Sequence, residues 1–257
     1  GKDVMCQKPL ALEVADAQRI VRRAEERGRI VAVQQQMRYE EGMLAARAMI
    51  ERGWLGKVAT MSIYVNIDTG FANWGWLGQV PRLELYFHSI HYIDTIRAFF
   101  GEPTSVFGTQ WRLPGQKPAG ETRSLSVLMY PGDLRAVVHA NHENPARDNE
   151  ARFRIDGSEG SIRGNLGLLA DYPHGRPDTL ELWSRVLPTD GWLPYPVTRR
   201  WVPDAFLGPV RSLLMAIEDG HDPESCAHDN IKTLALVDAL YRSGETGQAI
   251  AIEPDGP

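Results

Sequence analysis

The sequence predicts an α+β fold in which helices flank a large, mostly antiparallel sheet and a small strand–helix–strand unit opens the chain. Three observations support this prediction. Residues 1–36 read strand, helix, strand; residues 105–202 hold several short apolar runs separated by turn signals; and two helical patterns follow. We therefore expect a small unit over residues 1–36 and a larger α+β domain over residues 37–257 of the 257-residue chain.

The first unit has the pattern of two parallel strands joined by a helix. Apolar residues recur at helical spacing after the first strand: Val14, Ala17, Ile20, Val21 and Ala24. Gly28 ends this helix as a left-handed cap would, and residues 30–33 form an apolar strand. Parallel strands need such a crossover. A unit this small cannot build a doubly wound sheet, so we expect it to lie as a partly exposed flank.

The larger domain begins with a helix over 43–53, a strand over 58–67 and a helix over about 83–100. Clear strand patterns follow at 125–129, 134–139, 153–155 and 180–186. Helices are expected at about 206–218 and 230–241, and a last strand at 249–252. Because hairpin-like strands dominate this part, its sheet should be antiparallel.

Composition excludes several classes of function. The net charge is −5 with signs interspersed, so no basic stripe indicates a nucleic-acid partner. No apolar run approaches the roughly 20 residues of a membrane span, so no membrane partner is expected. The two cysteines, Cys6 and Cys226, suggest neither a disulfide framework nor a thiolate metal site, and they predict a reducing, cytoplasmic location.

Five segments, in order along the chain, resemble motifs of one enzyme family. They are Gln7-Lys8-Pro9, residues 37–39 with 48–58, His91-x-x-Asp94 followed by Gly101-x-Pro103, the hairpin at 156–162, and residues 239–252. The family is Gfo/Idh/MocA, whose members are nicotinamide-dependent oxidoreductases. The resemblance covers nearly the whole chain, and five motifs at compatible spacing are far more specific than a single Lys-Pro pair.

The resemblance implies that residues 1–36 are a remnant of an NAD(P)-binding Rossmann domain whose Gly-rich phosphate loop lies upstream. Gln7, Lys8 and Pro9 would then contact the cofactor, NAD or NADP. We expect the intact parent to transfer hydride between NAD(P) and a sugar, cyclitol or related polyol, and this chain alone to be inactive. The alternative is a non-catalytic carbohydrate-binding or oligomerisation domain.

Hydride transfer from a carbinol carbon needs a base near neutral pH and a cation that stabilises the developing alkoxide. Pro9 favours an extended Lys8 at the end of a strand, where α/β folds hold their ligands. Lys8 is thus the expected cation, and an ordinary strand-end lysine is the alternative. By resemblance, His91 is the general base and Asp94 accepts a substrate hydroxyl.

Other residues complete the predicted substrate site. His88 lies near His91 on the same predicted helix, Trp74 offers an aromatic face to a sugar ring, and Arg38 could meet substrate or cofactor. Where the family usually has an aspartate, four residues before His91, this chain has Phe87. Because Phe87 cannot orient an imidazole, Glu84 or His88 would have to serve if His91 is the base.

Three further patterns have alternative interpretations. His88-x-x-His91-x-x-Asp94 offers metal-ligand types, but these positions drift around a helix, so no metal site is predicted. His139 and Asn141 share one strand face. This face could line a sugar site, or it could be the solvent-exposed face of an antiparallel sheet. The late aromatic residues suit a buried sheet face or an interface: Trp183, Trp192, Tyr195 and Trp201. The resemblance favours a homo-oligomer formed through the open face of this sheet.

Overall fold

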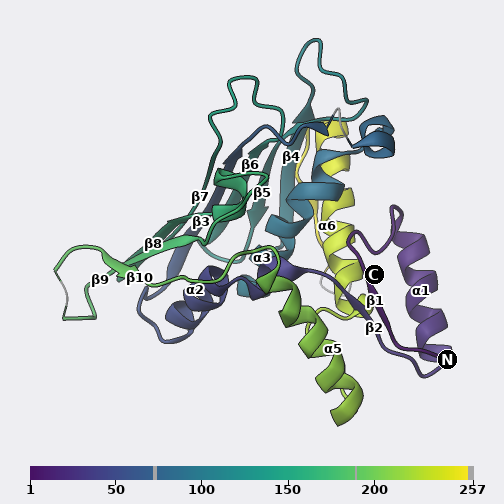
Figure 1. Ribbon diagram of the computed structural model, residues 1–257, viewed down its shortest axis with the longest axis horizontal. Helices are drawn as coiled ribbons and strands as arrows, with labels where there is room; N and C mark the ends of the chain where they lie inside the picture. Colours follow the sequence, from purple (N-terminus) through teal and green to yellow (C-terminus); the bar gives the residue numbers. More distant parts are fainter. Residues whose placement is uncertain (72–73, 189, 254–257) are drawn as a thin grey trace.

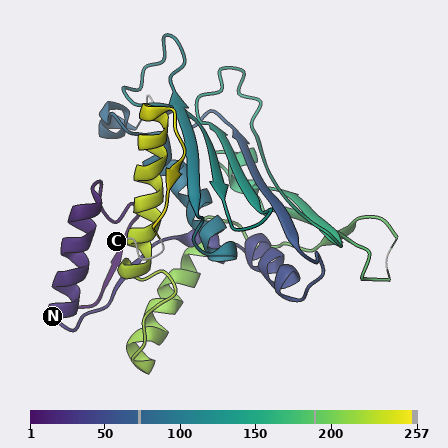
Figure 2. The same cartoon turned by 180° about the vertical axis from the view of Figure 1, so that it is seen from behind.

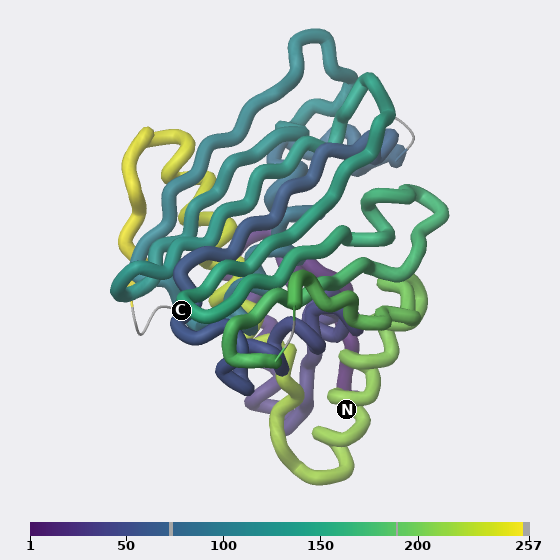
Figure 3. Tube along the Cα trace, turned by 90° about the vertical axis from the view of Figure 1, so that its left-hand side faces the viewer, coloured from purple at the N-terminus to yellow at the C-terminus, as the bar shows by residue number. Residues whose placement is uncertain are grey.

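The computed structural model describes residues 1–71, 74–188 and 190–253 (Figure 1). Within these ranges the chain forms a two-stranded sheet at the N-terminus and a nine-stranded sheet in the order β10-β9-β8-β7-β3-β6-β5-β4-β11. Helices cover one face of the large sheet, and Figure 3 shows the other face open. The predicted α+β architecture is confirmed.

The N-terminal unit consists of β1 (Val4–Cys6), α1 (Val14–Glu26) and β2 (Val31–Val33). The two strands pair in parallel, with Val4 opposite Val31. α1 buries only Ala17 and Val21 and lies beside α6 (Ala227–Thr246), as Figures 1 and 2 show. The unit is therefore a partly exposed flank, as its size predicted.

The large sheet is mostly antiparallel. Its strands are β3 (Val58–Asn66), β4 (Ser105–Trp111), β5 (Arg123–Met129), β6 (Arg135–Asn141), β7 (Glu150–Gly157), β8 (Gly160–Asn165), β9 (Thr179–Ser184), β10 (Leu193–Tyr195) and β11 (Ile250–Ala251). β3 pairs with β6 in parallel, and the other neighbouring pairs of this sheet are antiparallel. The four strand patterns named from the sequence correspond to β5, β6, β7 and β9.

Alternation separates the two faces of the sheet. In β4, Val106 is buried and Phe107 and Trp111 are exposed, so the aromatic residues lie on the open face. Gly108 faces α6, and a Cβ there would meet Leu240 at 2.9 Å. This glycine therefore allows the helix to approach the sheet closely.

The remaining helices are α2 (Glu41–Glu51), α3 (Ile90–Phe100), the short α4 (Gly167–Ala170) and α5 (Leu207–Asp219). α5 projects away from the sheet, as Figure 1 shows. Short 3-10 turns occur at Gln36–Tyr39, Gly75–Gln79 and Asp204–Phe206. In the part of the chain that is described, no helix is both long and apolar enough to span a bilayer.

The prediction of one regular helix over 83–100 is wrong in its first half. Leu85–Ser89 is a π-helical segment, and α3 begins only at Ile90. The Glu121 carboxylate accepts the Leu83 and Glu84 amides at 3.1 and 2.9 Å and so holds the start of the segment. The extra residue of the π turn changes the helical register, so His88 and His91 are not related as they would be in one regular α-helix.

Candidate active site

A cavity of about 490 Å³ lies where the end of β1 meets the π-helical segment. Its lining residues are Gln7, Lys8, Pro9, Ala11, Leu12, Trp74, Trp76, Leu77 and Phe87. Its volume is typical of a small-molecule site. Four predicted site residues thus line one cavity, which we call the Lys8 pocket: Gln7, Lys8, Pro9 and Trp74.

Lys8 is the ionisable residue among those that line this pocket. Its side-chain amine donates a hydrogen bond to the Phe87 carbonyl. Burial lowers the pKa of Lys8 to about 7, and the Glu84 carboxylate opposes that effect. Near neutral pH the amine can therefore exist with or without its proton, a property that acid–base chemistry uses.

His91 is buried on α3, and its ring meets the face of Trp201 edge-on at a centroid distance of 5.5 Å. Burial, and next the Lys8 charge, hold the pKa of His91 well below its usual value. Its Nδ1 has no hydrogen-bond partner among the described residues. The imidazole is therefore neutral at pH 7 and has a free ring nitrogen.

His88 contacts His142, a residue for which the sequence analysis predicted no role. The rings of His88 and His142 lie 4.3 Å apart, and Phe71 packs edge-on against His88 at 4.9 Å. Burial lowers the pKa of His142 to about 3, with a smaller contribution from Lys8. Burial, followed by the charges of His142, Lys8 and His91, lowers the pKa of His88 well below normal. Both rings are therefore neutral at pH 7.

Three polar groups hold His142. Its Nδ1 lies 2.9 Å from the Thr69 hydroxyl, and its Nε2 lies 3.5 Å from the Tyr92 hydroxyl and 3.7 Å from a Glu84 oxygen. His142 directly follows β6 and continues its alternation, after the buried residues Ala136, Val138 and Ala140. This period of two was the available signal for an inward-facing side chain.

His139 lies elsewhere, on the open face of the sheet. Its ring packs against Tyr64 at 5.2 Å and against Trp111 at 6.4 Å. Of the two interpretations of the His139 and Asn141 face, the geometry supports the solvent-exposed sheet face. This face is separate from the Lys8 pocket.

Arg38 and Asp94 contact each other. The Arg38 guanidinium donates to the two Asp94 oxygens at 2.5 and 2.7 Å, and Thr233 donates to the same carboxylate at 2.7 Å. A third contact joins Arg38 to Asp229 at 2.8 Å. Both side chains are nearly inaccessible to solvent. Their predicted contacts with substrate stay predictions.

This pairing also bears on metal binding. Asp94 is engaged with Arg38 and Thr233, so it is not grouped with His88 and His91 as a ligand set. Across residues 1–71, 74–188 and 190–253, no group of three or more histidine, cysteine, aspartate or glutamate side chains is placed to hold a metal ion.

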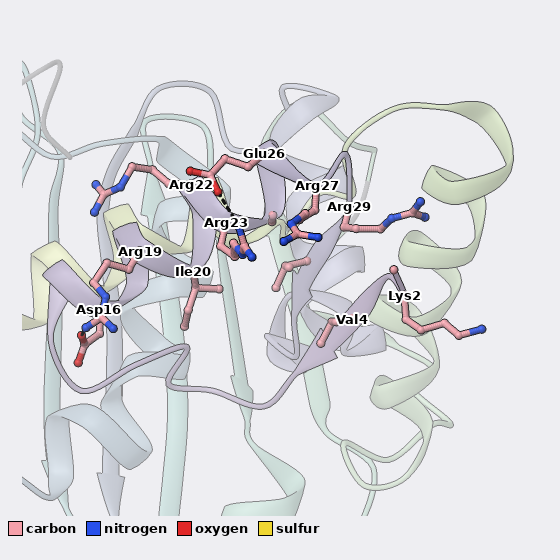
Figure 4. A pocket seen from close by; sticks show the side chains of 13 residues that line it. Lys2, Val4, Asp16, Arg19, Ile20, Arg22, Arg23, Glu26, Arg27 and Arg29 are labelled. Atoms are coloured by element: carbon pink, nitrogen blue, oxygen red, sulfur yellow. Dashed lines mark hydrogen bonds and ion pairs between the residues drawn. The ribbon is translucent and has the colours of Figure 1, made fainter.

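A larger cavity, of about 1170 Å³, lies between α1 and the β1–β2 pair (Figure 4). None of the predicted site residues lines it. Two of its arginine side chains already form ion pairs with neighbouring carboxylates: Arg19 with Asp16 at 2.6 Å and Arg23 with Glu26 at 2.9 Å. The smaller Lys8 pocket is the better candidate site because it combines concavity with buried ionisable groups.

Comparison with known families identifies the fold as that of a dinucleotide-dependent oxidoreductase. Residues 43–163 match the GFO/IDH/MocA C-terminal domain, and residues 1–35 match the oxidoreductase family with an NAD-binding Rossmann fold. The chain belongs to the Gfo/Idh/MocA family of NAD(P)-binding oxidoreductases.

Similar proteins include dehydrogenases named for sugar and cyclitol substrates. D-apiose dehydrogenase of Paraburkholderia graminis is 27% identical, in an alignment covering 98% of this chain and 67% of that protein. Inositol 2-dehydrogenase of Rhizobium meliloti is 23% identical, covering 98% and 73%. An Agrobacterium radiobacter oxidoreductase solved with NAD+, L-tartaric acid and magnesium has a TM-score of 0.83 at 21% identity, covering 97% and 72%.

Proposed function

We propose that this chain is the substrate-binding portion of an oxidoreductase that transfers hydride between NAD(P) and a sugar, cyclitol or related polyol. The observation that carries the proposal is the partly buried Lys8 amine on the wall of a pocket of about 490 Å³, where its charge lowers the pKa of the neutral His91. Relatives that act on D-apiose and inositol support the substrate class.

The pocket residues, together with His91, have the side chains that hydride transfer requires on the cofactor side and on the substrate side. Gln7, Lys8 and Pro9 follow β1 and would face the nicotinamide, which supplies the hydride acceptor when bound. Protonated Lys8 would donate a hydrogen bond to the reacting oxygen and stabilise negative charge there. As the carbon loses hydride, His91 would take the hydroxyl proton on a free ring nitrogen.

We further propose that this chain alone binds dinucleotide weakly. The printed sequence contains no G-x-G-x-x-G, the loop that cradles a pyrophosphate in Rossmann folds. The experiment compares the chain with the same chain placed after the dinucleotide-binding half of a relative, using NADH fluorescence and oxidation of a polyol panel.

Polyol-dependent NADH formation by the extended protein, and little by the chain alone, is the expected result. If the extended protein binds NADH but oxidises no polyol, the dehydrogenase proposal is rejected. Sugar binding without redox change would then favour the alternative function, a carbohydrate-binding domain, for which the Trp74 and Trp76 side chains of the pocket are suited.

We propose a homo-oligomer formed through the open face of the large sheet. Exposed aromatic residues gather there, including Phe107, Trp111 and Trp183. Arg163 lies over the Trp192 ring at 4.1 Å. Aromatic and arginine side chains are enriched in protein interfaces, which supports this assignment.

The cytoplasmic location stays a prediction, in keeping with the free thiols of Cys6 and Cys226.

A further inference from the structure

Another cavity, of about 620 Å³, lies at the end of the large sheet where β3 and β6 finish. Because β3 and β6 pair in parallel, their carboxyl ends meet at the same edge of the sheet. The segments that follow them supply residues 68–71, Glu143 and Arg147 to the lining. Two other connections supply the remaining residues: Gly115, Lys117, Tyr172 and Pro173. We call this space the Asp68 cavity.

The floor of the Asp68 cavity is set by the sheet. Beyond the last paired residues of β3 and β6, Asp68 and Glu143 form an antiparallel bridge. The Thr69 amide then donates to the His142 carbonyl at 3.2 Å. Residues that face each other across a bridge project to the same side, so the Asp68 and Glu143 side chains lie together on the cavity wall.

Two neighbouring carboxylates are unfavourable unless other groups compensate them. Arg147 pairs with Asp68 at 3.0 Å. Glu143 is less well satisfied, since one of its oxygens is buried and has no hydrogen-bond partner among the described residues. Burial raises the pKa of Glu143, and the Asp68 charge adds to this effect against the opposing charge of Arg123. A hydroxyl donor in the cavity would satisfy the unpaired oxygen.

The formal charges of the lining cancel. The charged lining residues are two carboxylates and two cations: Asp68, Glu143, Lys117 and Arg147. Phe71 and Tyr172 add aromatic ring surface. A neutral ligand with several hydroxyl groups donates and accepts hydrogen bonds and also has apolar C–H faces. Such a ligand suits this lining better than an anion or a cation does.

The Asp68 cavity is a neighbour of the Lys8 pocket. Phe71, which lines the cavity, packs edge-on against Trp74, which lines the pocket, at a centroid distance of 6.2 Å. The Thr69 hydroxyl lies 2.9 Å from Nδ1 of His142, and the His142 ring lies 4.3 Å from that of His88. A ligand in the cavity would therefore lie close to a ligand in the pocket.

We propose that the Asp68 cavity is a second binding site, which holds a neutral sugar or polyol unit beside the unit that reacts in the Lys8 pocket. A substrate of two linked units, such as a disaccharide, would use both sites. The identity of the reacting unit rests on the proposed function. Sugar binding in the Asp68 cavity is a property of the free chain and needs no cofactor.

The test compares the affinity of the full chain for maltose, a neutral disaccharide, with its affinity for glucose, by isothermal titration calorimetry. Maltose should bind about 10-fold more tightly or better, because its second unit binds at high effective concentration. Asp68→Asn with Glu143→Gln should remove most of this difference, since both side chains lose their charge and keep their shape. Asp171→Asn is the matched control and should keep the difference, because Asp171 is exposed and is not among the lining residues.

Equal affinities for maltose and glucose in the unaltered chain would overturn the second site, and so would a difference that persists in the folded double variant. Tighter binding of gluconate than of maltose would overturn the neutral ligand class. If the extended protein oxidises polyols but shows none of these effects, the second site alone is rejected. Conversely, a maltose preference that depends on the two carboxylates, in a protein that oxidises no polyol, supports the second site and rejects the proposed function.

Hydrogen exchange gives a second measurement that needs no variant, should the double variant fail to fold. Saturating maltose should slow the exchange of amides in residues 68–71 and 143–147, and glucose should slow it less. Protection by maltose confined to residues 7–12 and 74–77 would place both sugar units at the Lys8 pocket and contradict the proposal.

Discussion

The Lys8 amine donates its hydrogen bond to the carbonyl of Phe87, 79 residues further along the chain. This single contact joins the end of β1 in the N-terminal unit to the π-helical segment of the larger domain. The pocket between them therefore depends on both parts of the chain. A cation set in this way can stabilise charge on a bound oxygen without reorganising.

Lys8→Met should lower kcat/KM for polyol oxidation by about 100-fold or more, measured in the protein that carries a complete dinucleotide-binding domain. Lys57→Met, on an exposed lysine, is the control and should leave the rate unchanged. Urea unfolding should show little loss of stability, since methionine replaces a buried amine with an apolar group of similar length. A rate within a few-fold of the unaltered protein would exclude Lys8 from the chemistry.

The Arg38–Asp94 pair predicts a stability defect rather than a selective loss of substrate affinity. Both side chains are nearly fully buried, and Asp94→Asn leaves the Arg38 charge with less compensation. The free energy of unfolding should fall by about 3 to 5 kcal/mol, measured with urea. Asp133→Asn, which breaks the exposed pair with Lys57, should change it little. Unchanged stability with a raised KM would instead favour the predicted substrate contact.

Much of the fold could be predicted because it depends on local pattern. Alternation located β5 and β6, and helical spacing with Gly28 located α1. The π-helical segment could not be predicted in this way, because the carboxylate of Glu121, a residue distant in sequence, holds its first amides. A regular helix was the only expectation that spacing could give.

In the candidate site, too, the features set by local sequence could be predicted and those set by tertiary contacts could not. The Lys-Pro motif indicated Lys8, and the chemistry of an aromatic side chain suggested Trp74; the structure places both in one pocket. The pairing of Arg38 with Asp94 joins residues 56 apart in the chain, and the burial of His142 depends on three different elements. Such contacts are set by tertiary packing, about which a single sequence carries little information.

The buried carboxyl pair of Glu40 and Asp178 predicts a pH-dependent stability. Burial, and next the Asp178 charge, raise the pKa of Glu40 well above normal, and burial raises that of Asp178 to about 6. The folded state thus binds more protons than the unfolded chain, so folding weakens as pH rises from about 4 through these folded-state values. Glu40→Gln should be more stable than the unaltered protein at about pH 8 and lose that advantage near pH 4.

Its neighbour Glu41 provides the control with the opposite sign. Although partial burial opposes them, amide hydrogen bonds from Arg199 and Thr198 lower the pKa of Glu41. A lowered carboxyl pKa contributes stability above its unfolded value and loses it as the pH falls, so Glu41→Gln should be less stable than the unaltered protein at neutral pH. Urea unfolding of both variants between about pH 4 and 8 compares the slopes. Parallel curves for Glu40→Gln and the unaltered protein would contradict the prediction.

The open sheet face predicts an oligomer that specific charges can dissociate. Trp111 on β4 and Trp183 on β9 are 40% and 38% exposed, near opposite edges of this face. The strands between them add exposed arginines to this face, including Arg152 and Arg163, and protein interfaces are enriched in such aromatic and arginine side chains. Light scattering after size exclusion should show a dimer or larger assembly, and Trp111→Asp with Trp183→Asp should give monomers. Leu214→Asp tests the other exposed apolar surface, α5, where Leu214 is 61% exposed. Dissociation by Leu214→Asp alone would move the interface from the sheet to α5, whereas a monomeric unaltered protein would reject it altogether.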